Sequence, residues 1–178
     1  MCSSDLLQNA AQRLYGRQLN LTCMDSRDFK GDILKERASA YGADVAETIT
    51  GNAARLERNI GDRSFARIFI DAPCSGFGTL RRHQEIRWRA TPEGITDLAE
   101  KGLAILRSAA GHVQEGGDIV YSTCTVTRAE NLEVAKRFLE SEEGSAFKLG
   151  AIGGKACFAS LAAPGAPDAH FAVRFVRK

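Results

Sequence analysis

The stretch ARIFIDAPCSG, residues 66–76, has the pattern of a short buried strand that ends in a polar turn. Residues 66–70 are mostly apolar and include two isoleucines, which favours a strand. Asp71 and Cys74 follow directly after it. Because open α/β sheets bind ligands outside the carboxyl ends of their strands, Asp71 and Cys74 are candidate site residues.

Predicted strands and helices alternate on both sides of this stretch. Apolar runs and alternating patterns predict further strands over 19–24, 44–50, 118–123 and 168–178. Helical spacing of apolar residues predicts helices over 6–14, 31–42, 92–106 and 129–140. Strands that alternate with helices imply crossover connections, so the sequence predicts an α/β fold with a mostly parallel sheet.

Three local signals set expected boundaries of these elements. Thr91 is an N-cap candidate, and Pro92 occupies the first helical position after it. Thr127 and Glu130 have the spacing of a capping box, which predicts that a helix opens there. A Gly-Gly pair at 116–117 predicts a turn just before the strand that leads to Cys124.

Length and composition limit the possible classes of protein. At 178 residues the chain is expected to form one domain, residues 1–178, with a buried core. The 24 Lys and Arg against 22 Asp and Glu leave a net charge of +2, so attraction to phosphate must come from local clusters. Without a long apolar run or a secretory leader, we expect a cytoplasmic protein that makes no membrane contact. Five cysteines without a C-x-x-C pair argue against a disulfide framework and against a metal site of the zinc type.

Cys74 and Cys124 both follow apolar strands and would share one edge of a parallel sheet if those strands are neighbours. A single free cysteine is more often an inert core residue than a reactive one. Two cysteines at matched strand ends favour function, because a thiolate is a strong carbon nucleophile when nearby groups lower its pKa. Asp25 also ends a predicted strand, where a doubly wound fold often holds the ribose of a nucleoside-like cofactor. A turn or cap role for Asp25 is equally compatible with its position.

A basic cluster follows Cys74. Arginine side chains next to an aromatic residue fit phosphate contacts and base stacking, although a solvated charged loop has the same composition. The candidate RNA-binding residues are Arg81, Arg82, Arg87, Trp88 and Arg89.

Two motifs, DAPCSGFGTLRRHQEIRW at 71–88 and IVYSTCTVTRAEN at 119–131, resemble the signature motifs of the RNA cytosine-C5 methyltransferases, the Sun/Fmu and NSUN group. The similarity runs in register from about Ser4 to the C-terminus, and the ending PGAPDAHFAVRF is similar to that of bacterial members that modify small-subunit ribosomal RNA. The resemblance implies a Rossmann-like fold that uses S-adenosylmethionine. It implies that Cys124 is the nucleophile that attacks carbon 6 of cytosine and that Cys74 assists product release.

The same resemblance assigns the cofactor-binding residues. Asp25 matches the acid that holds the cofactor ribose, and Asp71 matches the acid beside the cofactor and the target base. Asn52 stands where the family commonly has an aspartate that contacts adenine. The family's first strand and its glycine-rich loop should precede the helix at Leu6, so we expect the C-terminal part of a longer catalytic domain that binds S-adenosylmethionine weakly or not at all. The sequences AAPG at 162–165 and GGK at 153–155 do not replace that loop, because they are not placed between a strand and a helix.

Alternatives remain at this point. The roles of Cys74 and Cys124 could be reversed, because DNA cytosine methyltransferases keep their nucleophile in a Pro-Cys after a strand. The chain could be a non-catalytic RNA-binding remnant, or a redox protein that uses both cysteines. Ribosomal RNA is the expected substrate, and transfer RNA is the alternative.

Overall fold

The computed structural model describes residues 16, 19–27, 36, 47–163 and 165–178. The predicted helices over 6–14 and 31–42 lie outside the described residues, except for Glu36, which is helical. The chain divides into two compact units, Met1–Gly61 and Asp62–Lys178. That residues 1–178 form one catalytic domain stays a prediction.

The first unit contains a small parallel sheet. Strand β1, Thr22–Asp25, pairs with β2, Glu47–Thr50; β2 lies within its predicted strand, and β1 extends one residue past its own. Asp25 is opposite Thr50, so both strands end at the same edge. Two short helical segments follow β2: η1, Ala53–Arg55, and α3, Glu57–Ile60.

The second unit contains a five-stranded mixed sheet in the order β3-β4-β7-β5, with β6 paired to β7. Strands β3 and β4 are parallel, whereas β7 is antiparallel to β4, β5 and β6. The α/β class is therefore confirmed, and the sheet is more mixed than predicted. The strands are β3 Phe65–Asp71, β4 Val113–Thr123, β5 Phe147–Gly150, β6 Cys157–Ala159 and β7 Phe171–Arg177.

Strands β1 and β3 lie in different sheets.

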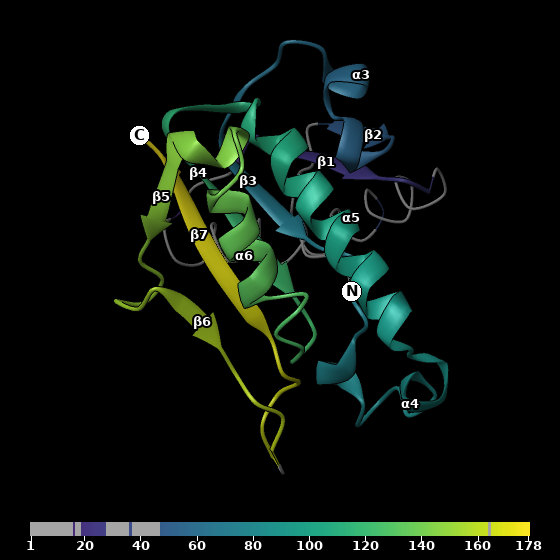
Figure 1. The fold of residues 1–178 in the computed structure, drawn as a ribbon. Helices are drawn as coiled ribbons and strands as arrows, with labels where there is room; N and C mark the ends of the chain where they lie inside the picture. Colours follow the sequence, from purple (N-terminus) through teal and green to yellow (C-terminus); the bar gives the residue numbers. More distant parts are fainter. Residues whose placement is uncertain (1–15, 17–18, 28–35, 37–46, 164) are drawn as a thin grey trace. The chain divides into compact units, whose positions relative to one another are not determined.

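Helices α5, Pro92–Ala110, and α6, Leu132–Leu139, cover one face of the sheet of the second unit (Figure 1). The α5 start is as predicted, because the Thr91 hydroxyl accepts a hydrogen bond from the Gly94 N–H at 3.0 Å. Phe138 of α6 is fully buried, and its ring centroid lies 4.8 Å from that of Phe175 in β7. This unit also contains α4, Ile86–Arg89, and the 3-10 segments η2, Phe77–Thr79, and η3, Glu143–Ala146.

Two predicted boundaries were wrong. Strand β4 begins at Val113, so Gly116 and Gly117 form an irregularity inside the strand and not a turn before it. Gly116 has a φ of 70°, which lets the chain bulge between the pair Phe65–Val113 and the pair Arg67–Asp118. Helix α6 begins three residues beyond residue 129, and the Glu130 side chain bonds to Ser75.

No helix in the described part of the chain is both long enough and apolar enough to cross a bilayer.

A buried carboxylate joins three neighbouring strands of the second unit. Asp118 of β4 is 3% exposed and accepts hydrogen bonds from Arg67 of β3 at 2.5 and 2.7 Å. It also accepts a bond from Arg174 of β7 at 2.8 Å. Burial raises the pKa of the Asp118 carboxyl, but the two guanidinium groups outweigh it, so this pKa lies below its ordinary value.

This cluster predicts a pH-dependent contribution to stability. We expect Asp118→Asn to lower the free energy of unfolding by about 2 kcal/mol near neutral pH, because two charged hydrogen-bond donors lose their anion. Since the pKa is depressed in the folded state, the contribution is present above the unfolded pKa of about 3.9 and is lost as the pH falls through the folded pKa. Urea unfolding at neutral and acidic pH measures it. Glu115→Gln, at an exposed position of the same strand, is the control, and an equal loss in both variants would contradict the prediction.

Candidate active site

Cys74 and Cys124 lie side by side in the second unit. Each follows one of two parallel neighbouring strands, β3 and β4, whose ends are aligned because Asp71 is opposite Ser122. Their Sγ atoms are 3.4 Å apart, which is within range of a hydrogen bond between sulfur atoms. The structure therefore brings together two thiols that are 50 residues apart in the sequence.

The two thiols have opposite pKa shifts. The pKa of Cys124 is lowered to about 7, mainly because the Cys74 thiol donates a hydrogen bond to its thiolate. Burial and the nearby Asp71 carboxylate oppose this shift. The pKa of Cys74 is raised by the same hydrogen bond and by burial. Cys124 is therefore the thiol that ionises near neutral pH, and Cys74 is the one that keeps its proton.

A network of polar side chains surrounds the two cysteine loops. The Glu130 carboxyl accepts hydrogen bonds from the N–H and the hydroxyl of Ser75, both at 2.6 Å. It also accepts a bond from the Thr127 hydroxyl at 2.5 Å, and the Ser75 hydroxyl lies 2.8 Å from that of Thr125. The predicted capping box is wrong. The Glu130 side chain bonds to the Cys74 loop, and no side chain caps the N-terminus of α6.

Asn131 and Gly78 hold the backbone beside Cys124. The Asn131 side chain accepts a hydrogen bond from Thr123 at 2.6 Å and donates one to the Thr125 carbonyl at 3.0 Å. The Gly78 N–H donates to the Cys124 carbonyl at 2.9 Å. A Cβ at position 78 would lie 2.2 Å from the Ala169 carbonyl oxygen, so only glycine fits there.

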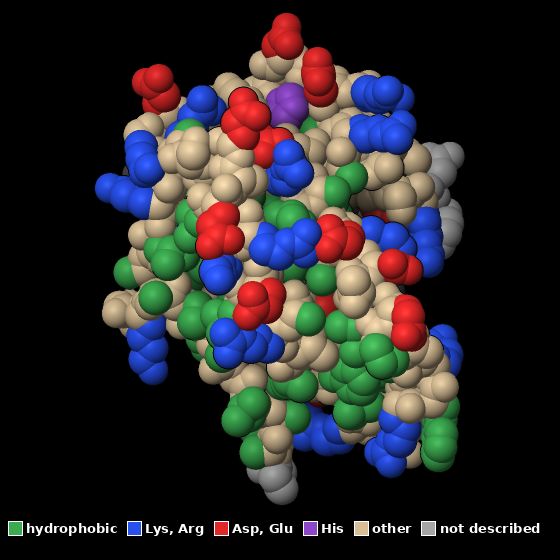
Figure 2. Space-filling view, viewed as in Figure 1, with side chains coloured by type: hydrophobic (Ala, Val, Ile, Leu, Met, Phe, Trp, Pro, Cys, Tyr) green, Lys and Arg blue, Asp and Glu red, His purple; other side chains and the backbone are tan. Residues whose placement is uncertain are grey.

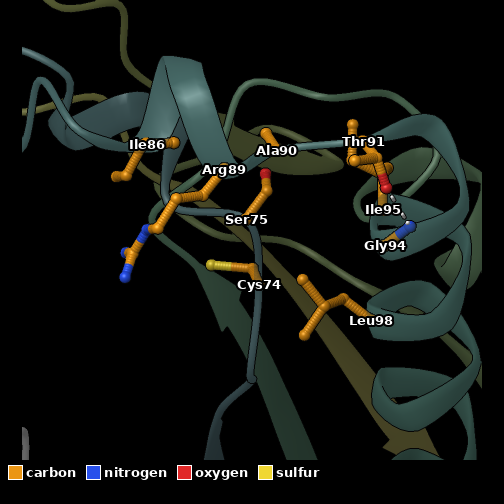
Figure 3. A pocket seen from close by; sticks show the side chains of 9 residues that line it. All are labelled: Cys74, Ser75, Ile86, Arg89, Ala90, Thr91, Gly94, Ile95 and Leu98. Atoms are coloured by element: carbon orange, nitrogen blue, oxygen red, sulfur yellow. Dashed lines mark hydrogen bonds between the residues drawn. The ribbon is translucent and has the colours of Figure 1, made fainter.

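A cavity of about 370 Å³ opens beside Cys74. Figure 3 shows the Cys74 sulfur between residues of α4 and residues of α5. Ile95 and Leu98 of α5 provide apolar wall, and Arg89 of α4 provides a positive charge. The cavity is widely open to solvent, and its lining combines apolar side chains with one charged group.

The predicted RNA-binding residues have different surroundings. Trp88 is 83% exposed, and Arg89 lines the cavity. The Arg82 Nε donates a hydrogen bond to the carboxyl group of the buried Asp168 at 2.8 Å. An Arg81 guanidinium nitrogen lies 3.6 Å from the other oxygen of the same carboxyl group. Arg81 and Arg82 therefore have a structural partner that the sequence did not indicate, whereas Arg87 is exposed on α4.

Charges of both signs cover the face shown in Figure 2, where Lys and Arg side chains alternate with Asp and Glu side chains. Two of the ion pairs join α5 to the elements after it: Glu100 with Arg137, and Arg107 with Glu143. A broad basic surface is not seen on this face.

The predicted cofactor residues belong to different units. In the first unit, Asp25 ends β1 and Asn52 follows β2 at the same edge of the small sheet. Asp25 accepts a hydrogen bond from the Arg27 N–H at 3.0 Å, and Asn52 caps η1 by accepting one from the Ala54 N–H at 2.9 Å. In the second unit, Asp71 ends β3 close enough to affect the pKa of Cys124. Among the described residues, no three His, Cys, Asp or Glu side chains gather as metal ligands would.

Known sequences match much of the chain. The sequence model of the family described as 16S rRNA methyltransferase RsmB/F matches residues 7–156. The "Probable ribosomal RNA small subunit methyltransferase B" of Bacillus subtilis is 38% identical over 121 residues, which are 68% of this chain and 27% of that protein. The ribosomal RNA small subunit methyltransferase B of an Enterobacter species is 36% identical over 69% of this chain and 28% of its own length. The chain thus spans little more than a quarter of the length of these curated relatives.

Solved structures share the fold. The crystal structure of PH0851 has a TM-score of 0.79 at 22% identity and covers 92% of this chain and 38% of its own. The structure described as NSun6 from Pyrococcus horikoshii with SFG has a TM-score of 0.75 at 20% identity, over 98% of this chain and 44% of its own. These likenesses confirm the Rossmann-like methyltransferase fold.

The thiol pair predicts the pH dependence of Cys124 alkylation. We expect the rate of its reaction with iodoacetamide to rise with pH around a pKa of about 7, because only the thiolate reacts. Cys74→Ala removes the donor and should move this pKa above the ordinary thiol value of about 8.5, because burial and Asp71 then act without that opposing hydrogen bond, with at least about a tenfold slower reaction at neutral pH. Cys74→Ser keeps an O–H donor and should keep most of the shift. Peptide mass spectrometry measures each site, and an unchanged profile in Cys74→Ala would show that the hydrogen bond has no such effect.

Proposed function

The chain belongs to the RsmB/F family of 16S rRNA methyltransferases, and on that basis we propose that it takes part in methylating carbon 5 of a cytosine in ribosomal RNA. The observation that carries this proposal is the 3.4 Å contact between two thiols, one of which has a pKa of about 7. A reactive thiolate is what methylation at this carbon needs, because carbon 5 is a poor nucleophile in the intact ring.

Cys124 is the proposed nucleophile. Its thiolate adds to carbon 6 of cytosine, which moves electron density to carbon 5 and makes that carbon able to accept a methyl group. S-adenosylmethionine, when bound, supplies the electrophilic methyl group. Removal of the carbon 5 proton then expels the Cys124 thiolate and restores the aromatic ring.

Cys74 is the proposed residue for product release. Its pKa is raised mainly because it faces the Cys124 thiolate. Once the Cys124 sulfur is bonded to carbon 6 it carries no negative charge, so this cause of the raised pKa disappears. Cys74 can then lose its proton to solvent and accept the proton from carbon 5. The order of the two pKa values therefore favours these roles over the reversed assignment.

The cavity beside Cys74 is the proposed site of the target base; Cys124 does not line it, and its Sγ lies 3.4 Å from that of Cys74, which does. The cavity lies between apolar residues of α5 and the guanidinium of Arg89, which suits a flat base that is joined to a phosphate backbone. Trp88 is exposed enough to stack on a neighbouring base, and Arg87 could pair with phosphate. The substrate class, ribosomal RNA, would place the reaction in the cytoplasm.

The acidic and amide side chains at the strand ends fit the proposed cofactor. A carboxylate such as Asp25 accepts the two hydroxyl groups of a ribose, and the Nδ2 group of Asn52 can donate to an adenine edge. Asp71, in the second unit, is proposed separately as a cofactor contact, as the family resemblance implies.

The covalent step can be tested with RNA that contains 5-fluorocytosine. Fluorine cannot leave carbon 5 as a proton does, so the adduct with Cys124 should persist through denaturing electrophoresis. Because the chain matches about a quarter of the B. subtilis relative, the assay is run on the chain itself and on a fusion that adds the unmatched remainder of that relative. Cys124→Ala should abolish the adduct, whereas Cys74→Ala should retain it. Cys157→Ala, at a cysteine in β6, is the matched control.

The outcomes separate the alternatives. Loss of the adduct in Cys74→Ala together with its retention in Cys124→Ala would reverse the two roles. Salt-sensitive RNA binding without an adduct in either protein would indicate the non-catalytic RNA-binding alternative. Adducts with transfer RNA but not with ribosomal RNA would change the substrate.

A further inference from the structure

Glu130 is the acidic side chain that joins the two cysteine loops. It is 1% exposed, and its carboxyl lies between the loop after β3 and the loop after β4. One oxygen, Oε1, accepts from the Ser75 N–H. The other oxygen, Oε2, accepts from the hydroxyls of Ser75 and Thr127. Ser75 is next to Cys74 in the sequence, so the carboxyl holds the backbone of the Cys74 loop directly.

The proton positions in this network are determined by its geometry. Because the Ser75 hydroxyl donates to Glu130, it must accept at its contact with Thr125. The Thr125 hydroxyl therefore donates to Ser75, and its oxygen accepts from the Thr127 N–H at 3.4 Å. Thr125 is next to Cys124. The chain of bonds from Glu130 through Ser75 to Thr125 thus connects the residues that follow the two thiols.

The backbone of Glu130 adds a second attachment. Its carbonyl accepts a hydrogen bond from the hydroxyl of Tyr121 at 2.9 Å. Tyr121 is 1% exposed and belongs to β4, the strand that leads to Cys124. Glu130 is therefore anchored to the central sheet while its side chain holds the Cys74 loop. A buried carboxyl that is bonded on all sides is costly to break and fixes the geometry around it.

We propose that Glu130 is a positioning residue that sets the distance between the Cys74 and Cys124 thiols. It does not line the cavity and acts through Ser75 and Thr125. Its importance for catalysis rests on the proposed function, because release by Cys74 requires that this thiol stay close to the Cys124 adduct. Its effect on thiol geometry does not depend on RNA or on cofactor.

The positioning role of Glu130 can be measured through the effective concentration of the Cys74 thiol at the Cys124 thiol. The chain is equilibrated in glutathione buffers of graded ratio, and peptide mass spectrometry measures the fraction that carries a Cys74–Cys124 disulfide. Two thiols lose two protons and two electrons, and oxidised glutathione takes them up. Glu130→Ala should shift the midpoint about tenfold toward oxidising buffer, because the loops are no longer held together.

Three further variants make the test specific. Glu130→Gln should stay within about twofold of the wild type, because its amide can accept from the Ser75 N–H and donate to the two hydroxyls. Ser75→Ala should give an intermediate shift of about threefold. Glu133→Ala removes an acid of α6 that pairs with Arg128 on the surface, and it should have no effect.

A folded Glu130→Ala variant with an unchanged midpoint would overturn the proposal. If circular dichroism shows that Glu130→Ala does not fold, Ser75→Ala and Thr127→Val decide, and unchanged midpoints in both overturn it equally. If Glu130→Ala shifts the midpoint but neither the wild-type chain nor the fusion forms an RNA adduct, the proposed function is overturned and the positioning role is kept.

Discussion

The parallel pairing of β3 with β4 is the constraint on which the site depends. It aligns Asp71 with Ser122, so the two loops that follow leave the sheet side by side. Cys74 and Cys124 are near each other only because these strand ends are in register, since a shift of one residue would turn alternate side chains to the opposite face. The buried Asp118 supports the same pairing from the other end, through Arg67 in β3 and Arg174 in β7.

Much of this arrangement could be predicted from the sequence, because it follows from local patterns. The apolar run at 66–70, the Thr91-Pro92 helix start and the alternating C-terminal strand all have the predicted structure. The proximity of the two cysteines followed from one further assumption, that their strands are neighbours. That assumption is correct because parallel strands joined by one helical crossover, here α5, usually lie close together.

Contacts between distant parts of the chain could not be predicted in this way. Thr127 and Glu130 have the spacing of a capping box, but Ser75, 55 residues away from Glu130, offers a half-buried N–H that binds the carboxyl. Asp168 gave no local signal for its pairing with Arg82, 86 residues earlier. The Gly116 bulge depends on the register with β3, which is a property of two strands and not of one. In each case a tertiary partner decides what a locally plausible residue does.

The close approach of Gly78 to Ala169 has a consequence for the order of assembly during protein synthesis. Gly78 contacts the Cys124 backbone on one side and Ala169 on the other, and β7 follows Ala169 directly. The ribosome makes residues 169–177 after both cysteine loops have been made. The contact between Gly78 and Ala169 therefore forms only after this late segment has been translated, whereas the β3–β4 pairing that brings the two thiols together uses segments that are made earlier.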